Sequence, residues 1–248
     1  MSGSDLIKAA LEEMSLSSRR RFLRNTLSLG GLALLTGCDV INEDAAEKVL
    51  MRVSRFNDRA QALLFSAGNL APTYPESRIT RPFPFNAFYS EDEAPVVDGD
   101  SYRLEVSGLV ADKTAWSLER LRALEQTSQV TRHICVEGWS AIGKWGGVPF
   151  AKFLRIIGAD TTAKYVGFKC ADNYYQSIDM PTALHQQTLL ALTYDGQTLP
   201  RKYGYPLKLR MPTKLGYKNP KHIMALFVTN TNPGGYWEDQ GYNWFGGS

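Results

Sequence analysis

The sequence is poor in cysteine and lacks the cysteine spacings that hold haem or zinc. Three cysteines occur among 248 residues, at Cys38, Cys135 and Cys170. There is no Cys-x-x-Cys pair and no Cys-x-x-Cys-His motif, which excludes a covalently attached c-type haem and the usual zinc-binding spacings. We therefore expect no haem in this chain.

Nucleotide-binding loops and a strong excess of one charge are also missing. Neither Gly-x-x-x-x-Gly-Lys-Ser/Thr nor Gly-x-Gly-x-x-Gly occurs, so the sequence gives no local support for ATP or NAD. The formal net charge is +3, and residues 38–248 carry 23 basic and 22 acidic side chains. This balance indicates no nucleic-acid partner. With 44% hydrophobic and 21% charged residues, the composition is typical of a soluble globular protein.

The N-terminal part has no apolar run long enough to cross a membrane. The uncharged stretch Thr26–Leu35 has roughly ten residues, whereas a spanning helix needs about 20. It follows Ser18-Arg-Arg-Arg-Phe-Leu-Arg24, which matches the twin-arginine export pattern, and it leads into Leu35-Thr-Gly-Cys38, which resembles a lipobox. We predict that residues 1–37 are a signal peptide read by the twin-arginine translocase. An uncleaved basic amphipathic helix is the alternative interpretation.

This leader predicts where the protein is found and what it carries. We expect a periplasmic protein, with Cys38 as the candidate site of a lipid anchor in the inner membrane. The twin-arginine route carries folded proteins, often ones that receive a cofactor in the cytoplasm, and therefore favours a complex redox cofactor.

The rest of the chain predicts one mixed domain after a short helical segment. Apolar residues recur at helical spacing between Ala46 and Leu63, so residues 38–71 are predicted to form an amphipathic helix and a linker. Helices are expected after Ser117 and between Pro149 and Gly158, and a turn at Asp195-Gly196. Strands are expected at Tyr102–Val110, Val130–Val136, Tyr165–Cys170, Tyr175–Asp179, Leu189–Tyr194, Leu207–Met211 and Ile223–Thr229. Because strands and helices do not alternate regularly, we predict an α+β domain over residues 72–248, with flanking helices on a mixed, largely antiparallel or barrel-like sheet.

A thiol, an imidazole and a carboxylate come together at the end of one predicted strand. His133, Cys135 and Glu137 would share one face if that strand stays regular. The glycines and tryptophans that follow, up to Pro149, predict a tight loop around a bulky group. The residues alone leave three readings open: a metal ligand, a Cys–His hydrolase, or a buried core cysteine.

A second cluster is basic. Six residues within fifteen positions are basic and are interrupted by glycine and proline, which places several of them on loops: Lys208, Arg210, Lys214, Lys218, Lys221 and His222. Such loops favour an anion site over the alternative of a solvated basic face. The aromatic tail Pro233–Phe245 is expected to wall a pocket, face a partner or simply pack, and we assign it no chemistry.

Three segments resemble one known family. Cys135-Val-Glu-Gly-Trp-Ser140, Asn86-Ala-Phe-Tyr89 and Gly216–Ile223 resemble motifs of the sulfite-oxidase-type molybdopterin-binding fold. The branch they are most similar to is the catalytic subunit of periplasmic protein-methionine-sulfoxide reductases. The resemblance covers about residues 72–248 and keeps the family order of the motifs.

The resemblance implies a molybdenum–molybdopterin cofactor and assigns residues to it. Cys135 matches the thiolate that ligates molybdenum. Glu137 matches a carboxylate near the metal, either a proton donor or a structural group. Cofactor contacts are implied at Asn86, Tyr89, Ser90, Asn219 and Lys221, and also at Cys170, Tyr203 and Lys208, where relatives carry Thr, Asn and Arg.

The resemblance also implies an activity: oxygen-atom transfer that reduces S-oxides, either small molecules or protein-bound groups. Electrons are expected from a membrane subunit linked to haem or quinone. Oxidation of sulfite is the alternative reaction. A lipoprotein that uses the fold only as a binding module is the non-enzymatic alternative.

Overall fold

The computed structural model describes residues 50, 52–58, 60–61 and 68–248. The predicted signal peptide and Cys38 lie outside the described residues. The chain divides into two compact units, Met1–Val53 and Ser54–Ser248, and the second carries the features described below. The described residues between 50 and 61 are helical, within the segment predicted to be an amphipathic helix. No described helix has both the length and the apolar character needed to cross a membrane.

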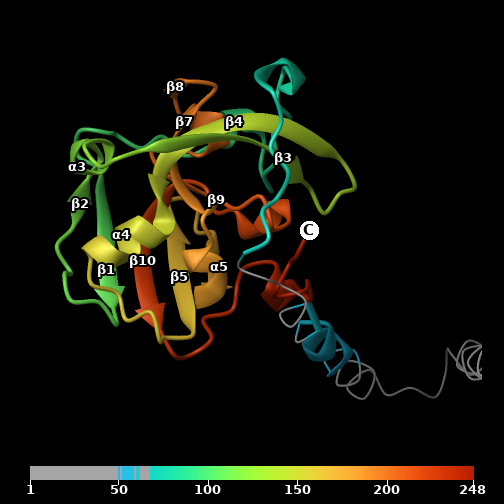
Figure 1. Cartoon of the computed structure of the whole chain (residues 1–248), viewed down its shortest axis with the longest axis vertical. Helices are drawn as coiled ribbons and strands as arrows, with labels where there is room; N and C mark the ends of the chain where they lie inside the picture. Colours follow the sequence, from blue (N-terminus) through green and yellow to red (C-terminus); the bar gives the residue numbers. More distant parts are fainter. Residues whose placement is uncertain (1–49, 51, 59, 62–67) are drawn as a thin grey trace, which may run out of the picture. The chain divides into compact units, whose positions relative to one another are not determined.

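The strands of the second unit form two sheets (Figure 1). One has the order β2-β1-β10-β5-β6 and the other the order β3-β4-β7-β8, with β9 also paired to β7. The described strand pairs are antiparallel except for β1 with β10. The strands are β1 Arg103–Gly108, β2 Trp116–Ser117, β3 Thr127–Ile134, β4 Ser140–Pro149, β5 Tyr165–Cys170, β6 Tyr175–Asp179, β7 Leu189–Tyr194, β8 Gln197–Thr198, β9 Lys208–Arg210 and β10 Ile223–Thr229. The mixed, largely antiparallel architecture is the one expected.

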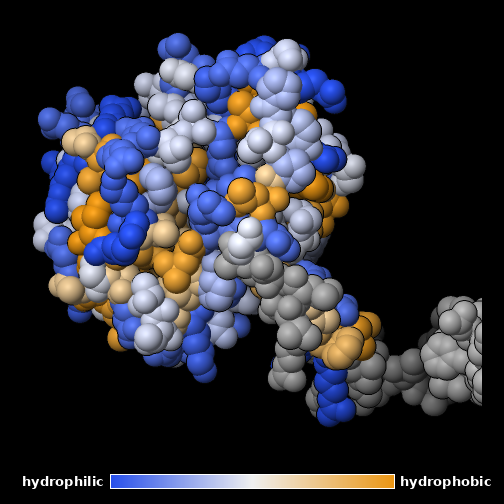
Figure 2. Space-filling model, in the orientation of Figure 1, coloured by the Kyte–Doolittle hydropathy of each residue, from blue (hydrophilic) through white to orange (hydrophobic). Residues whose placement is uncertain are grey.

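Short helices connect the strands where local chemistry predicts them. Helix α3 begins after Ser117, whose hydroxyl accepts a hydrogen bond from the Arg120 N–H group at 3.1 Å. The helices and 3₁₀ turns are η1 Glu76–Arg78, η2 Glu91–Glu93, α3 Leu118–Arg122, α4 Phe150–Ile156, α5 Met180–Leu184, η3 Arg201–Tyr203, η4 Gly216–Lys218 and η5 Glu238–Gln240. Fully buried side chains such as Leu104, Phe153 and Leu226 form the main core. Figure 2 shows hydrophilic residues over much of one outer face.

One prediction was wrong: the glycine- and tryptophan-rich segment after the central motif is not a loop. It forms β4, which pairs with β3 on one side and β7 on the other. Glycine allows this pairing, because a Cβ atom at Gly147 would overlap the carbonyl oxygen of Leu190 on β7. The neighbouring Trp145 is only 1% exposed and packs with Tyr203 and Phe83 in a separate small core.

The preceding strand ends earlier than predicted. β3 stops at Ile134, and a tight turn follows, in which the Cys135 N–H group donates to the carbonyl oxygen of Trp139 at 2.9 Å. Gly138 makes this turn with a φ of 92°. His133 and Cys135 are both buried, but Glu137 is exposed, so the regular alternation expected from His133 to Glu137 does not extend to Glu137.

Candidate active site

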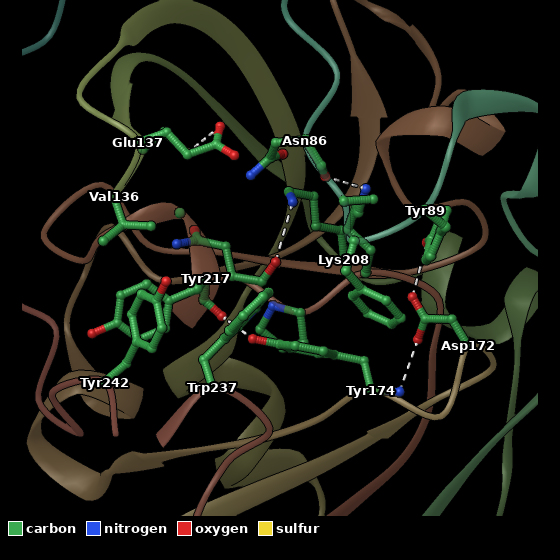
Figure 3. Close-up of a pocket in the computed structure, with 17 residues that line it drawn as sticks. Asn86, Tyr89, Val136, Glu137, Asp172, Tyr174, Lys208, Tyr217, Trp237 and Tyr242 are labelled. Atoms are coloured by element: carbon green, nitrogen blue, oxygen red, sulfur yellow. Dashed lines mark hydrogen bonds between the residues drawn. The ribbon is translucent and has the colours of Figure 1, made fainter. Parts of the chain in front are cut away.

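One cavity of the second unit lies where the predicted site residues meet (Figure 3). It is lined by the loop around Asn86, the turn after β3, the start of η4 and the C-terminal tail. Seven of the predicted site residues line it: Asn86, Tyr89, Cys135, Glu137, Lys208, Asn219 and Lys221. Tertiary folding thus gathers three segments that are far apart in the sequence.

Cys135 and Glu137 contact each other at the cavity wall. The Sγ atom of Cys135 donates a weak hydrogen bond to Oε2 of Glu137 at 3.5 Å, and the indole N–H of Trp139 donates to the same oxygen at 2.9 Å. Burial raises the pKa of the Cys135 thiol, and the nearby Glu137 carboxylate adds to this shift. A thiol in this environment ionises readily only when a cation arrives beside it.

Three basic side chains lie at or near the site: Lys208 and Lys221 line the cavity, and the fully buried Arg210 shares strand β9 with Lys208. Lys208 and Arg210 extend from β9, and Lys221 donates to the Asn86 carbonyl oxygen at 2.7 Å. Among the described residues, no ion pair joins any of the three to a carboxylate. Burial lowers the pKa of Lys221 to about 8 and that of Lys208 well below its usual value. An anion bound among them would relieve this cost.

Asp172 lines the cavity beside Tyr89 and was missed by sequence reasoning. Its Oδ2 accepts from the Tyr89 hydroxyl at 2.8 Å, and its Oδ1 accepts from the Tyr174 N–H group at 3.1 Å. Burial raises the pKa of Tyr89, and the Asp172 charge raises it further, so Tyr89 stays a neutral hydrogen-bond donor. The position of Asp172, two residues after Cys170, was the only available signal.

Three predicted residues lie off the cavity wall. Ser90 is exposed, and its hydroxyl and N–H groups both donate to Glu93 at the start of η2. Cys170 is 8% exposed at the end of β5 and does not line the cavity. Tyr203 donates to the Phe83 carbonyl oxygen at 2.7 Å and lines a small neighbouring cavity that also touches Asn86, Lys208 and Lys221.

The basic cluster divides in two. Whereas Lys208 and Lys221 face the cavity, the Lys218 ammonium forms a buried ion pair with Glu238 at 2.6 Å and donates to Gln176. The Lys214 ammonium donates to the Phe245 carbonyl oxygen at 2.8 Å. These two lysines fasten the C-terminal tail, and the tail contributes Trp237 and Tyr242 to the cavity.

His133 does not pair with Cys135. Its imidazole is 2% exposed, and neither ring nitrogen has a hydrogen-bond partner within the described part of the chain. Burial lowers its pKa well below the usual value, as do the charges of Arg210, Lys208 and Lys221. The geometry therefore lacks the thiol–imidazole hydrogen bond that a Cys–His hydrolase uses. In the described part of the chain, no three His, Cys, Asp or Glu side chains gather to hold a metal ion.

Comparisons with known proteins agree with this site. The family model of the oxidoreductase molybdopterin binding domain matches residues 91–237. An Azospira oryzae chain, provisionally named protein-methionine-sulfoxide reductase subunit YedZ1, is 66% identical over 98% of this chain and 93% of its own length. The protein-methionine-sulfoxide reductase catalytic subunit MsrP of Gluconobacter oxydans is 29% identical over 69% of this chain, and that of Xanthomonas campestris is 34% identical over 56%.

The chain spans 62% and 48% of the lengths of these two MsrP relatives. Among solved structures, the sulfane dehydrogenase SoxCD of Paracoccus pantotrophus matches with a TM-score of 0.52 and 21% identity, over 56% of this chain and 40% of that one. This last likeness concerns the fold alone. With the family model covering more than half of its residues, the chain belongs to the oxidoreductase molybdopterin-binding domain family and is a molybdopterin-binding oxidoreductase.

Proposed function

We propose that this oxidoreductase reduces S-oxides in the periplasm with electrons from a membrane partner. In the overall reaction the S=O bond breaks, two electrons and two protons are consumed, and a sulfide and water leave. The names of the relatives from Azospira oryzae, Gluconobacter oxydans and Xanthomonas campestris support this reaction class. Because the chain belongs to a family of oxidoreductases, S-oxide reduction is favoured over the two alternatives, a Cys–His hydrolase and a non-enzymatic binding module.

The residues of the cavity fit a molybdopterin, whose phosphate is an anion. Lys208 and Arg210 are buried, Lys221 is half-buried, and none of the three has a carboxylate partner among the described residues. Gly216 lets η4 lie close to the buried His133 side chain, because a Cβ atom at Gly216 would come within 2.7 Å of the His133 Nε2 atom. Buried charges that lack a counter-charge are costly unless an anionic ligand supplies one.

The cavity residues suggest how the cofactor is held. When bound, molybdenum supplies two-electron chemistry coupled to the transfer of an oxygen atom. The Sγ atom of Cys135 would hold the metal as a thiolate. Lys208 and Lys221 would hold the phosphate, and polar groups of Asn86, Tyr89 and Asn219 would orient the pterin. The roles of Ser90, Cys170 and Tyr203 stay predictions from the resemblance.

Glu137 is proposed to hold a proton for the oxygen that leaves. Its Oε2 atom lies 3.5 Å from the Cys135 sulfur. Because two negative charges at this distance repel each other, a proton shared by the pair stabilises it when the sulfur is ionised. That proton is then positioned to convert a departing oxygen into water.

The observation that carries the choice of substrate is the character of the cavity mouth near Cys135. A carboxyl group, Glu137, and large apolar side chains such as Val136 and Tyr242 stand there. The apolar side chains can pack against the organic substituents of an S-oxide, which sulfite, a small anion, does not carry. S-oxide reduction is therefore favoured over sulfite oxidation.

The predicted signal peptide, residues 1–37, and Cys38 are the basis for proposing export to the periplasm and an electron donor in the membrane. The twin-arginine pattern at Ser18–Arg24 supports translocation of the folded, cofactor-loaded protein. A lipid on Cys38 would hold the enzyme at the inner membrane, beside a haem- or quinone-linked donor.

The proposal is tested with protein purified from a host that makes molybdopterin. We expect one molybdenum per chain, reduction of methionine sulfoxide by a reduced viologen dye, and little sulfite oxidation with a dye acceptor. Cys135→Ser should remove the molybdenum and the turnover, while Cys170→Ser should retain the metal. Protein that lacks molybdenum, or Cys135→Ser protein that turns over normally, would contradict the proposal.

A further inference from the structure

The cavity has two chemically different sides (Figure 3). Tyr89 and Asp172 lie on one side, where Lys221 also places its ammonium 5.7 Å from the Tyr89 ring. Val136 and Tyr242 lie on the opposite side, and Val136 follows Cys135 directly in the sequence. On the first side, the Lys221 ammonium can bind an anionic group of the cofactor. The apolar side borders the sulfur that is proposed to hold the metal.

The apolar side is a wall of aromatic rings from the C-terminal tail. The rings of Trp237 and Tyr242 are 5.1 Å apart, and the Tyr217 ring lies 5.8 Å from Tyr242. All three line the cavity. Aromatic pairs at such distances pack favourably and present a broad apolar surface.

The wall is fixed in place by a buried ion pair. Glu238 directly follows Trp237 and accepts from the Lys218 ammonium at 2.6 Å, with the lysine side chain 1% exposed and the glutamate side chain 6% exposed. The Tyr217 hydroxyl also donates to the Asn243 carbonyl oxygen at 2.6 Å, next to Tyr242. A wall held from both sides can discriminate between ligand shapes, since it does not adapt freely.

Large apolar side chains at the mouth remain accessible to solvent. Val136 is 45% exposed, Phe88 43% and Tyr242 39%, although they come from three separate segments. Exposed apolar residues that gather around a cavity are typical of a binding surface, whereas exposed apolar residues scattered singly over a protein are not. Because they line the same cavity as Cys135 and Glu137, the reacting molecule is the expected ligand.

We propose that Trp237 and Tyr242 form a subsite that selects S-oxides bearing an aromatic or bulky apolar substituent on sulfur. The inference rests on the proposed function. The oxygen of the S-oxide must face Cys135 and Glu137 to react, so the substituents on sulfur point away from these groups. The aromatic wall lies on the same side of the cavity as Val136, the residue after Cys135 (Figure 3), and receives one of these substituents.

The test compares two substrates within one enzyme preparation. The cofactor-loaded enzyme is assayed with methyl phenyl sulfoxide and with dimethyl sulfoxide, and the ratio of the two kcat/KM values is formed. This ratio does not depend on cofactor loading or on the folded fraction, because both cancel. We expect Trp237→Leu and Tyr242→Leu each to lower the ratio about three- to tenfold, the range of measured aromatic pair contributions.

Trp244→Leu is the matched control. Trp244 belongs to the same tail but does not line the cavity, and its indole N–H donates to the Ser177 hydroxyl at 3.1 Å. The ratio of kcat/KM values of the Trp244→Leu enzyme should equal that of the unmodified enzyme.

Three outcomes would contradict the proposal. An unchanged ratio in both Trp237→Leu and Tyr242→Leu, with both substrates still reduced, would overturn the subsite alone. An equal fall in Trp244→Leu would indicate general loosening of the tail and would also overturn it. Loaded enzyme that reduces neither S-oxide would overturn the proposed function and the subsite with it.

Discussion

The Oε2 atom of Glu137 lies 3.5 Å from the Sγ atom of Cys135, and the Trp139 indole N–H fixes the same oxygen at 2.9 Å. The tight turn after β3 creates this contact, because it folds residue 137 back onto residue 135. The indole hydrogen bond holds the carboxyl group in one orientation. The carboxyl group and the sulfur can therefore share one proton at the cavity wall.

Replacing Glu137 tests whether its carboxyl group supplies a proton to the leaving oxygen. We expect Glu137→Gln to keep its molybdenum and to lose about 10² to 10⁴-fold in kcat for S-oxide reduction, because the amide cannot supply a proton to the leaving oxygen. Molybdenum content and steady-state rates across a pH series measure this. Glu119→Gln, at an exposed position on α3, is the control. Equal kcat values in the Glu137→Gln and unmodified enzymes would rule out the role.

The charged Lys221 side chain should lower the free energy of unfolding as long as no anion is bound beside it. Burial lowers its pKa from 10.5 to about 8. Below pH 8 the lysine is charged in both the folded and the unfolded chain, so the full burial cost applies. Between pH 8 and 10.5 the unfolded chain binds more protons, so the free energy of unfolding rises with pH in this window.

Lys221→Met should remove that dependence. In cofactor-free protein at pH 7 we expect its free energy of unfolding to exceed that of the parent by about 1–3 kcal/mol, and the difference to shrink by pH 10.5. In the loaded host, the same variant should retain less molybdopterin. Urea denaturation at the two pH values and fluorescence of the released pterin measure the two effects. A less stable variant that keeps its full cofactor content would be inconsistent with an anion site here.

The buried ion pair of the tail should contribute to stability. We expect Glu238→Gln to lower the free energy of unfolding by about 3–5 kcal/mol, since it leaves the Lys218 ammonium buried without its counter-charge. The exposed pair Lys202–Glu91, with a 2.9 Å separation, supplies the control, and Glu91→Gln should cost less than about 1 kcal/mol. Chemical denaturation of both variants gives the comparison, and similar losses in the two would contradict it.

The leader can be tested without reference to the site. The double substitution Arg19→Lys, Arg20→Lys should leave the protein in the cytoplasm, because the twin-arginine pair is the element that the translocase reads. Cys38→Ser should move the exported protein from the membrane fraction to the soluble periplasmic fraction. Cell fractionation followed by immunoblotting measures both, and a double variant exported normally would refute the assignment of the leader.

Local chemistry in the sequence determined much of the fold. The strands β5, β6, β7 and β10 begin and end at the predicted residues, because short segments rich in apolar, β-branched and aromatic residues can be recognised without a distant partner. The Asp195-Gly196 turn follows from residues that adopt positive φ, here 49° and 78°. The family motifs likewise predicted Cys135, Asn86 and Lys221 as site residues, and all three line the cavity.

Only the tertiary structure decided which of these groups face one cavity. Lys218 and Lys221 are three residues apart and look alike in sequence, yet Glu238 neutralises the first while the second faces the cavity. Asp172 and Trp237 reach the cavity from segments with no motif, and β4 is a strand because glycines let β7 approach closely. Burial and charge pairing depend on residues that are distant along the chain, and so no local pattern encodes them.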